Sequence, residues 1–106
     1  MAWVILICAG LLEIIWAFSM KSSEGFSKLV PTLLTLFFVT LSFLMLSYAM
    51  KSLPLGTAYT VWAGIGVVGS FVVGIVLLGE SASPIRVIAA VLILSGLILM
   101  KVGTET

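Results

Sequence analysis

A glutamate near the middle of the first apolar segment constrains this chain more than any other residue. In the stretch GLLEIIWAFSMK, Gly10 to Lys21, Glu13 is the sole acidic or basic residue of an apolar run that extends from Ala2 to Met20. A charged side chain at the centre of a bilayer costs at least about 2.5 kcal/mol, so such residues face an interior, form pairs and mark paths for ions or substrates. Glu13 therefore predicts a functional site inside a membrane.

The rest of the chain also has the composition of a membrane protein. Of its 106 residues, 62% are hydrophobic and only 8% are charged. A spanning helix needs about 20 predominantly apolar residues, and Ala2 to Met20, Leu29 to Met50 and Leu53 to Leu78 each supply such a run. A fourth, shorter run lies between Arg86 and Lys101, whose charged ends can reach the headgroups.

We therefore predict an all-α integral membrane protein with four transmembrane helices in a single domain, residues 1–106. Pro84 directly after Ser83 is typical of a helix start, because proline is favoured at the first helical position after a serine cap. The expected helices cover about 2–20, 29–50, 55–78 and 84–102.

Several classes of protein are disfavoured by what the sequence lacks. No basic residue precedes the first apolar run and no small-residue cleavage pattern follows it, which argues against a cleavable signal peptide. The chain has no histidine and one cysteine, so zinc or haem ligation is not expected. We expect no metal, no cofactor, no nucleic-acid partner and no enzymatic activity.

The connectors between the expected helices are short and carry a balanced charge. They occupy residues 21–28, 51–56 and 79–84, so consecutive helices should be antiparallel neighbours, and a site in so small a unit should need a second copy. With four spans, three cations fall on each side: Lys21, Lys28 and Arg86 on one, and Lys51, Lys101 and the N-terminal amine on the other. The usual positive-inside bias is nearly absent, which predicts insertion in both orientations and allows a dimer of oppositely oriented subunits.

The neighbours of Glu13 on its helix suggest how it functions. Burial disfavours the charged form of a carboxylate, so Glu13 is expected to hold a proton near neutral pH and release it when a cation arrives. Helical spacing places Gly10 and Trp16 near it. Gly10 either makes room for a ligand or packs closely against another helix, and the Trp16 indole needs a buried acceptor. The alternative is a protonated Glu13 that only links helices.

The third segment, GTAYTVWAGIGVVGSF, carries aromatic donors and glycines on one helical face. Its members Tyr59, Trp62, Gly66 and Gly69 follow one another at intervals of three and four residues. The pair Gly64 and Gly66 beneath Trp62 suggests a hinge, although each glycine is also explained by close packing. The second segment offers several hydroxyls, and spacing alone ranks none of them first.

The fourth segment has small residues among its apolar ones but no charge between its ends. We expect Ala89, Ala90 and Gly96 to pack against the fourth helix of a partner subunit, because small side chains allow helices to approach closely. Glu80 and Arg86 flank the last connector, where we expect them to be solvated.

The whole chain resembles the small multidrug resistance family of proton-coupled exporters, and within it the guanidinium exporter subtype. The resemblance rests on AGLLEIIWAFSMKSSEGF at 9–26 and KSLPLGTAYTVWAGIGVVG at 51–69, supported by the serine of LSFLMLS. The tryptophan three residues after the glutamate and the KxLPLGTAY stretch favour the guanidinium subtype.

The resemblance implies an antiparallel homodimer in the bacterial inner membrane. In it, Glu13 from each subunit forms one site that opens to either side in turn, and protons and a guanidinium-type cation compete for this site. The sequence does not determine the proton stoichiometry, for which two carboxylates make two protons per cation the natural guess. Residue by residue it assigns substrate and proton binding to Glu13, Trp16, Ser42, Tyr59, Trp62 and Gly10. Thr60 and Ala63 depart from the family pattern, which more often has Ala and Thr at these places.

Two other functions remain open at this stage. A broad exporter of lipophilic quaternary ammonium cations would share the fold and the membrane carboxylate. A membrane subunit without transport activity, or one half of a heterodimeric exporter, would use Glu13 for helix contacts or a different partner.

Overall fold

The four predicted membrane helices are present in the computed structural model, which describes residues 1–105. The helices are α1 (Ala2–Ser22), α2 (Leu29–Ala49), α3 (Leu55–Leu78) and α4 (Pro84–Glu105). Each is long and apolar enough to cross a membrane. Helices suit this environment because they satisfy every backbone hydrogen bond within the segment, where lipid offers no partners. The prediction of an all-helical, multi-pass membrane protein is confirmed.

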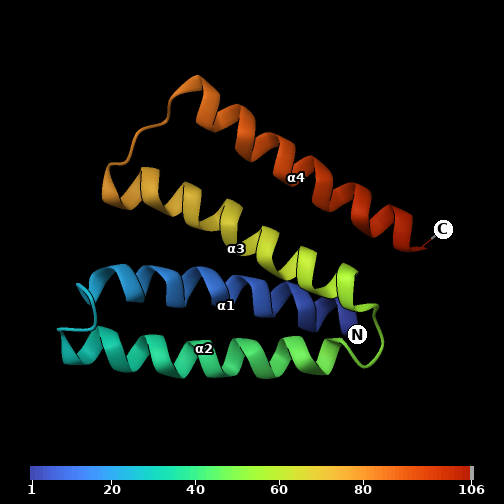
Figure 1. Ribbon diagram of the computed structural model, residues 1–106, viewed down its shortest axis with the longest axis horizontal. Helices are drawn as coiled ribbons and strands as arrows, with labels where there is room; N and C mark the ends of the chain where they lie inside the picture. Colours follow the sequence, from blue (N-terminus) through green and yellow to red (C-terminus); the bar gives the residue numbers. More distant parts are fainter. Residues whose placement is uncertain (106) are drawn as a thin grey trace.

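The helices lie side by side in the order α2, α1, α3, α4 (Figure 1). The molecule is flattened and measures 45 × 35 × 16 Å. Helix α1 packs extensively against both α2 and α3, whereas α2 and α3 touch each other only slightly. The expectation that every pair of consecutive helices packs as neighbours was therefore wrong for α2 and α3. Their short connector joins their ends, but α1 occupies the space between them.

The packed core is small and lies among α1, α2 and α3. It consists of seven buried residues: Leu6, Ala9, Leu46, Ala49, Ala58, Val61 and Trp62. Most other large apolar side chains are exposed on the protomer, as expected for surfaces that face lipid or a second subunit.

Helix α4 is the least integrated element. It packs mainly against α3, reaches α1 where Lys101 Nζ lies 5.0 Å from the centre of the Trp3 ring, and has no buried residue in its membrane-spanning stretch. Of the small residues predicted to pack against a partner, Ala89 and Gly96 are exposed and Ala90 is half-buried. A Cβ added at Gly96 would meet nothing within 4 Å.

The connectors explain where the helices stop. Ser23 ends the α1 region by donating its hydroxyl to the Met20 carbonyl (2.7 Å) and accepting from the Phe26 N–H (3.0 Å). Gly79 ends α3 in the left-handed conformation (φ 70°), which glycine adopts without steric cost. The Ser83 hydroxyl accepts the Arg86 N–H (3.4 Å), so the predicted cap before Pro84 is confirmed.

Candidate functional site

Glu13 projects from the middle of α1 toward α3 and lies against Gly66. A Cβ built on Gly66 would collide with the carboxyl carbon, Oε1 and Cγ of Glu13. The glutamate is half-buried, and its position at mid-helix places it deep in the apolar segment. The absence of a side chain at position 66 therefore creates the space that the Glu13 carboxyl group occupies.

Gly10 does not make room for a ligand in this structure; it is a point of close helix packing. It is buried, and a Cβ there would meet Cβ and Cγ2 of Ile65 at 2.8 Å. Gly10 thus lets α1 and α3 approach each other closely, one turn away from Glu13. The packing alternative describes Gly10 in this conformation, and Gly66 makes room for the carboxylate.

Two polar atoms of this site have no partner within the described chain. Among residues 1–105, Glu13 Oε1 and Trp16 Nε1 are buried side-chain atoms without a hydrogen bond. An unpaired buried polar group costs about 1–3 kcal/mol. Such a pair of unsatisfied atoms on one helix, an acceptor and a donor three residues apart, is typical of a site that is completed by a ligand or another subunit.

Ser42 is the centre of a buried hydrogen-bond network that joins three helices. Its hydroxyl donates to the Ala9 carbonyl of α1 (2.8 Å) and accepts from Trp62 Nε1 of α3 (3.0 Å). Both Ser42 and Trp62 are almost completely buried. Among the described residues of this protomer, neither Ser42 nor Trp16 hydrogen-bonds to Glu13, so Glu13 is not the buried acceptor of the Trp16 indole in this conformation.

Aromatic rings continue the site from Trp62. The Trp62 ring lies 5.6 Å from the Tyr59 ring and 5.1 Å from the Phe43 ring, between centroids. These three residues form what we call the aromatic cluster. Tyr59 is half-exposed, so the cluster runs from the core to the protomer surface. Phe43 was not among the predicted residues; its position beside Ser42 in the sequence was the signal that could have found it.

The glycines of α3 are points of close approach to other helices. Besides Gly66 against Glu13, Gly69 lies against Ile14 of α1 and Gly64 against Leu97 of α4. Helix α3 is continuous from Leu55 to Leu78. The proposed hinge at Gly64, Gly66 and Gly69 therefore stays a prediction, and the packing explanation accounts for all three in this conformation.

Thr60 and Ala63, the two departures from the family pattern, lie at different depths. Thr60 is exposed, whereas Ala63 packs against the buried core. Neither side chain forms a described hydrogen bond with Glu13 or Ser42.

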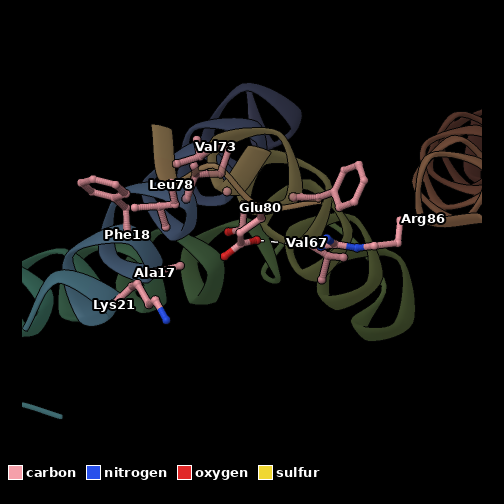
Figure 2. A pocket seen from close by; sticks show the side chains of 12 residues that line it. Ala17, Phe18, Lys21, Val67, Val73, Leu78, Glu80 and Arg86 are labelled. Atoms are coloured by element: carbon pink, nitrogen blue, oxygen red, sulfur yellow. Dashed lines mark ion pairs between the residues drawn. The ribbon is translucent and has the colours of Figure 1, made fainter. Parts of the chain in front are cut away.

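A second group of charged residues lies at the connector end of α1 and α3. Glu80 and Arg86 form an ion pair (3.8 Å) and, with Lys21, line a cavity of about 320 Å³ between these helices (Figure 2). Their side chains are about two-fifths exposed. This exposure agrees with the expectation that Glu80 and Arg86 are solvated, but the expectation did not include their ion pair or the turn after α3, which folds Glu80 back over the helix.

Comparison with known proteins places the chain in context. The family model described as Small Multidrug Resistance protein matches residues 1–93. The chain is 57% identical over 104 residues to a protein named guanidinium exporter from Yersinia pestis, with 98% of this chain and 100% of that protein covered. It is 52% identical over 105 residues to the guanidinium exporter of Escherichia coli (strain K12), covering 99% and 100% of the two chains.

A third relative gives the same result: the guanidinium exporter of Citrobacter freundii is 50% identical over 105 residues, which cover 99% of this chain and 100% of that one. These names indicate transport rather than enzymatic catalysis. With a family model that matches most of its length and relatives that align from end to end, the chain belongs to the small multidrug resistance family.

Proposed function

We propose that this protein is a proton-coupled antiporter that exports guanidinium and small guanidinyl cations by alternating access. One observation carries the proposal: the Glu13 carboxyl group lies half-buried in the space left by Gly66, with Oε1 unpaired among the described residues. The relatives named guanidinium exporter, at 50–57% identity, support the choice of cation.

The chemistry of the site suits a small planar cation. Guanidinium presents paired N–H donors in one plane, and such a pair matches the two oxygens of a carboxylate. A proton and this cation bind the same oxygens, so they compete. Arrival of the cation on one side of the membrane then requires that Glu13 release its proton, which couples the two flows in opposite directions.

A second subunit would complete the site. The protomer is a flattened layer with α1 between α2 and α3, and the buried Oε1 of Glu13 has no hydrogen-bond partner among the described residues. The balanced charge of the connectors supports two opposite orientations in the membrane, and therefore an antiparallel homodimer with paired Glu13 side chains. Exposed Gly96 and Ala89 on α4 offer small-residue contacts to the partner. The bacterial inner membrane is the proposed location.

Proton flux in liposomes tests this function. Guanidinium added outside sealed liposomes that contain the protein is expected to drive protons outward, and Glu13→Gln, which keeps the side-chain shape, is expected to abolish the exchange. The matched control is Glu24→Gln, because Glu24 is an exposed carboxylate that pairs with Lys28 (3.6 Å) in the first connector. Exchange that survives in Glu13→Gln would refute the proposal.

Export of lipophilic quaternary ammonium cations is the second candidate, and the aromatic cluster favours it. The faces of Phe43, Tyr59 and Trp62 resemble the surfaces that bind quaternary ammonium groups, which have no N–H donors and depend on cation–π attraction. The same liposomes decide between the candidates. Faster proton flux with a bulky quaternary ammonium than with guanidinium would favour this second function.

A further inference from the structure

The cavity between α1 and α3 runs along the two helices from the connector end, which we call its mouth. Its lining includes Lys21 and Glu80 at the mouth, and Ile14 and Val67 further along the helices. Ile14 and Val67 directly follow Glu13 and Gly66 in the sequence, but Glu13 and Gly66 themselves do not line the cavity. The charged groups of this cavity are therefore separate from the Glu13 site.

The end of α3 fixes Glu80 at this mouth. The Glu80 N–H donates to the Gly74 carbonyl (3.0 Å), past the left-handed Gly79, whose own N–H donates to the same carbonyl. The backbone thus reverses, and the Glu80 carboxylate lies over Gly74, where a Cβ would collide with its Oε1. Glu80 is therefore placed by the fold rather than left free in the connector.

The side chain that Glu80 binds is itself a guanidinium. Arg86 places one nitrogen 3.8 Å from Glu80 Oε1 (Figure 2) and donates from another to the Ser81 carbonyl. Its guanidinium carbon lies 5.0 Å from the centre of the Phe71 ring. A carboxylate, a carbonyl and an aromatic face are the three kinds of group that bind a guanidinium ion.

We infer that these groups form a second guanidinium site at the mouth of the cavity, in which the free cation exchanges with the side chain of Arg86. We call it the mouth site, and define it by Phe71, Gly74, Glu80, the Ser81 carbonyl and Arg86. Its choice of ligand rests on the proposed function. It differs from the Glu13 site because the chain already supplies a guanidinium that must be displaced.

Charge and exposure make this exchange feasible. One monovalent cation replaces another at Glu80, so the carboxylate keeps a partner at both stages, while Arg86 gives up its ion pair. The Arg86 side chain is about two-fifths exposed, so it can turn toward water or headgroups after it is displaced. A tethered group has an effective concentration in the millimolar range, and free guanidinium should compete in that range.

The direct test uses the fact that Arg86 is the single arginine of the chain. In the full-length protein in lipid nanodiscs, its Nε–H gives one side-chain NMR signal that belongs to the mouth site. The measurement is made in Glu13→Gln, so that binding at the membrane glutamate does not contribute. Guanidinium chloride in the millimolar range is expected to shift this signal saturably toward its position in Glu13→Gln/Glu80→Gln, where Arg86 has lost its carboxylate.

Tetramethylammonium chloride at the same concentration is the control for ionic strength, because this ion carries the charge but no N–H donors. An Arg86 signal that does not move with guanidinium, or that moves equally with both salts, would overturn the inference. The NMR measurement does not depend on transport. The mouth site can therefore be refuted while proton-coupled exchange is observed, and it can be supported while that exchange is absent.

Transport provides a second readout. Glu80→Gln is expected to lower the guanidinium-driven proton flux by about twofold to fivefold at subsaturating guanidinium, the range for loss of a partly exposed ion pair, with little change at saturation. Arg86→Gln is expected to lower the guanidinium concentration for half-maximal flux, because the internal competitor is gone. Glu24→Gln should match the unmodified protein. If Glu80→Gln and Glu24→Gln are indistinguishable while the unmodified protein transports, the mouth site is wrong and the proposed function stands.

Discussion

At the scale of single residues, the contact between Glu13 and Gly66 defines the candidate site. Position 66 has room for no side chain, because a Cβ would meet the carboxyl group of Glu13. Ser42 forms the second fixed point, with hydrogen bonds to the Ala9 carbonyl and the Trp62 indole. These two contacts determine where a ligand can bind and which rings border it.

Gly66→Ala is expected to displace the Glu13 carboxyl group and to weaken guanidinium binding at least about fivefold, because an overpacked position costs about 1–3 kcal/mol. The fold should survive, since the end of a flexible side chain can move. Isothermal titration of guanidinium measures the change. Gly56→Ala in the same helix is the control, because a Cβ there meets nothing within 4 Å; equal binding by the two variants would contradict the assignment.

Ser42→Ala is expected to leave the buried Trp62 indole without its acceptor and to lower the stability of the protein by about 1–3 kcal/mol. Unfolding in mixed micelles, followed by tryptophan fluorescence, measures this loss. Thr40→Ala is the matched control, since the exposed Thr40 hydroxyl donates only to the Leu36 carbonyl of its own helix (2.8 Å). A Ser42→Ala protein as stable as the Thr40→Ala protein would show that the network contributes nothing.

At the scale of helices, the sequence predicts which elements exist better than it predicts how they meet. Apolar length and the Ser83–Pro84 start were sufficient for four helices. The face shared by Trp62 and Gly66 was also predictable from helical spacing. The alignment of α3 along α1 was not, because periodicity within one helix carries no information on its axial position against another. For this reason Gly10, rather than Gly66, was considered as the residue that makes room.

The contacts of Glu80 with Arg86 and Gly74 were missed for a related reason. Short polar connectors with single charges usually lie in water, so Glu80 and Arg86 gave no signal on their own. Their placement depends on the backbone reversal at Gly79 and on the lack of a side chain at Gly74. Both are properties of the folded turn.

Helix α4 supplies a test of the dimer. Gly96→Phe is expected to disrupt the dimer, because the position is open in the protomer but is predicted to contact the partner. Val91→Phe is the control: Val91 is exposed, and five residues of separation place it about 140° around the helix from Gly96. Molar mass from light scattering in detergent measures the outcome, and an intact Gly96→Phe dimer would count against this packing surface.

At the scale of the whole molecule, the flattened protomer and its balanced connectors suggest that the functional unit contains two chains in opposite orientations. Three cations lie on each side of the membrane by sequence, so small changes of charge should decide orientation. The direction of insertion is thus expected to be a tunable property of the chain.

Ala82→Lys and Ser52→Lys add a positive charge to opposite sides, and both positions are exposed. Each variant alone is expected to insert mainly in one orientation and to lose transport, and coexpression of the two should restore it. Labelling of tagged termini and proton flux measure the two effects. Full transport by a variant that inserts in a single orientation would contradict the antiparallel dimer.

Competition between protons and guanidinium for the Glu13 carboxylates is tested most directly by counting protons released when guanidinium binds. Calorimetric titration in buffers of different ionisation enthalpy measures this number. Shared carboxylates predict up to two protons released per cation bound to the dimer, weaker binding as the pH falls because protons occupy the site, and no proton release in Glu13→Gln. Guanidinium binding without proton release in the unmodified protein, or proton release that persists in Glu13→Gln, would contradict competition at the Glu13 carboxylates.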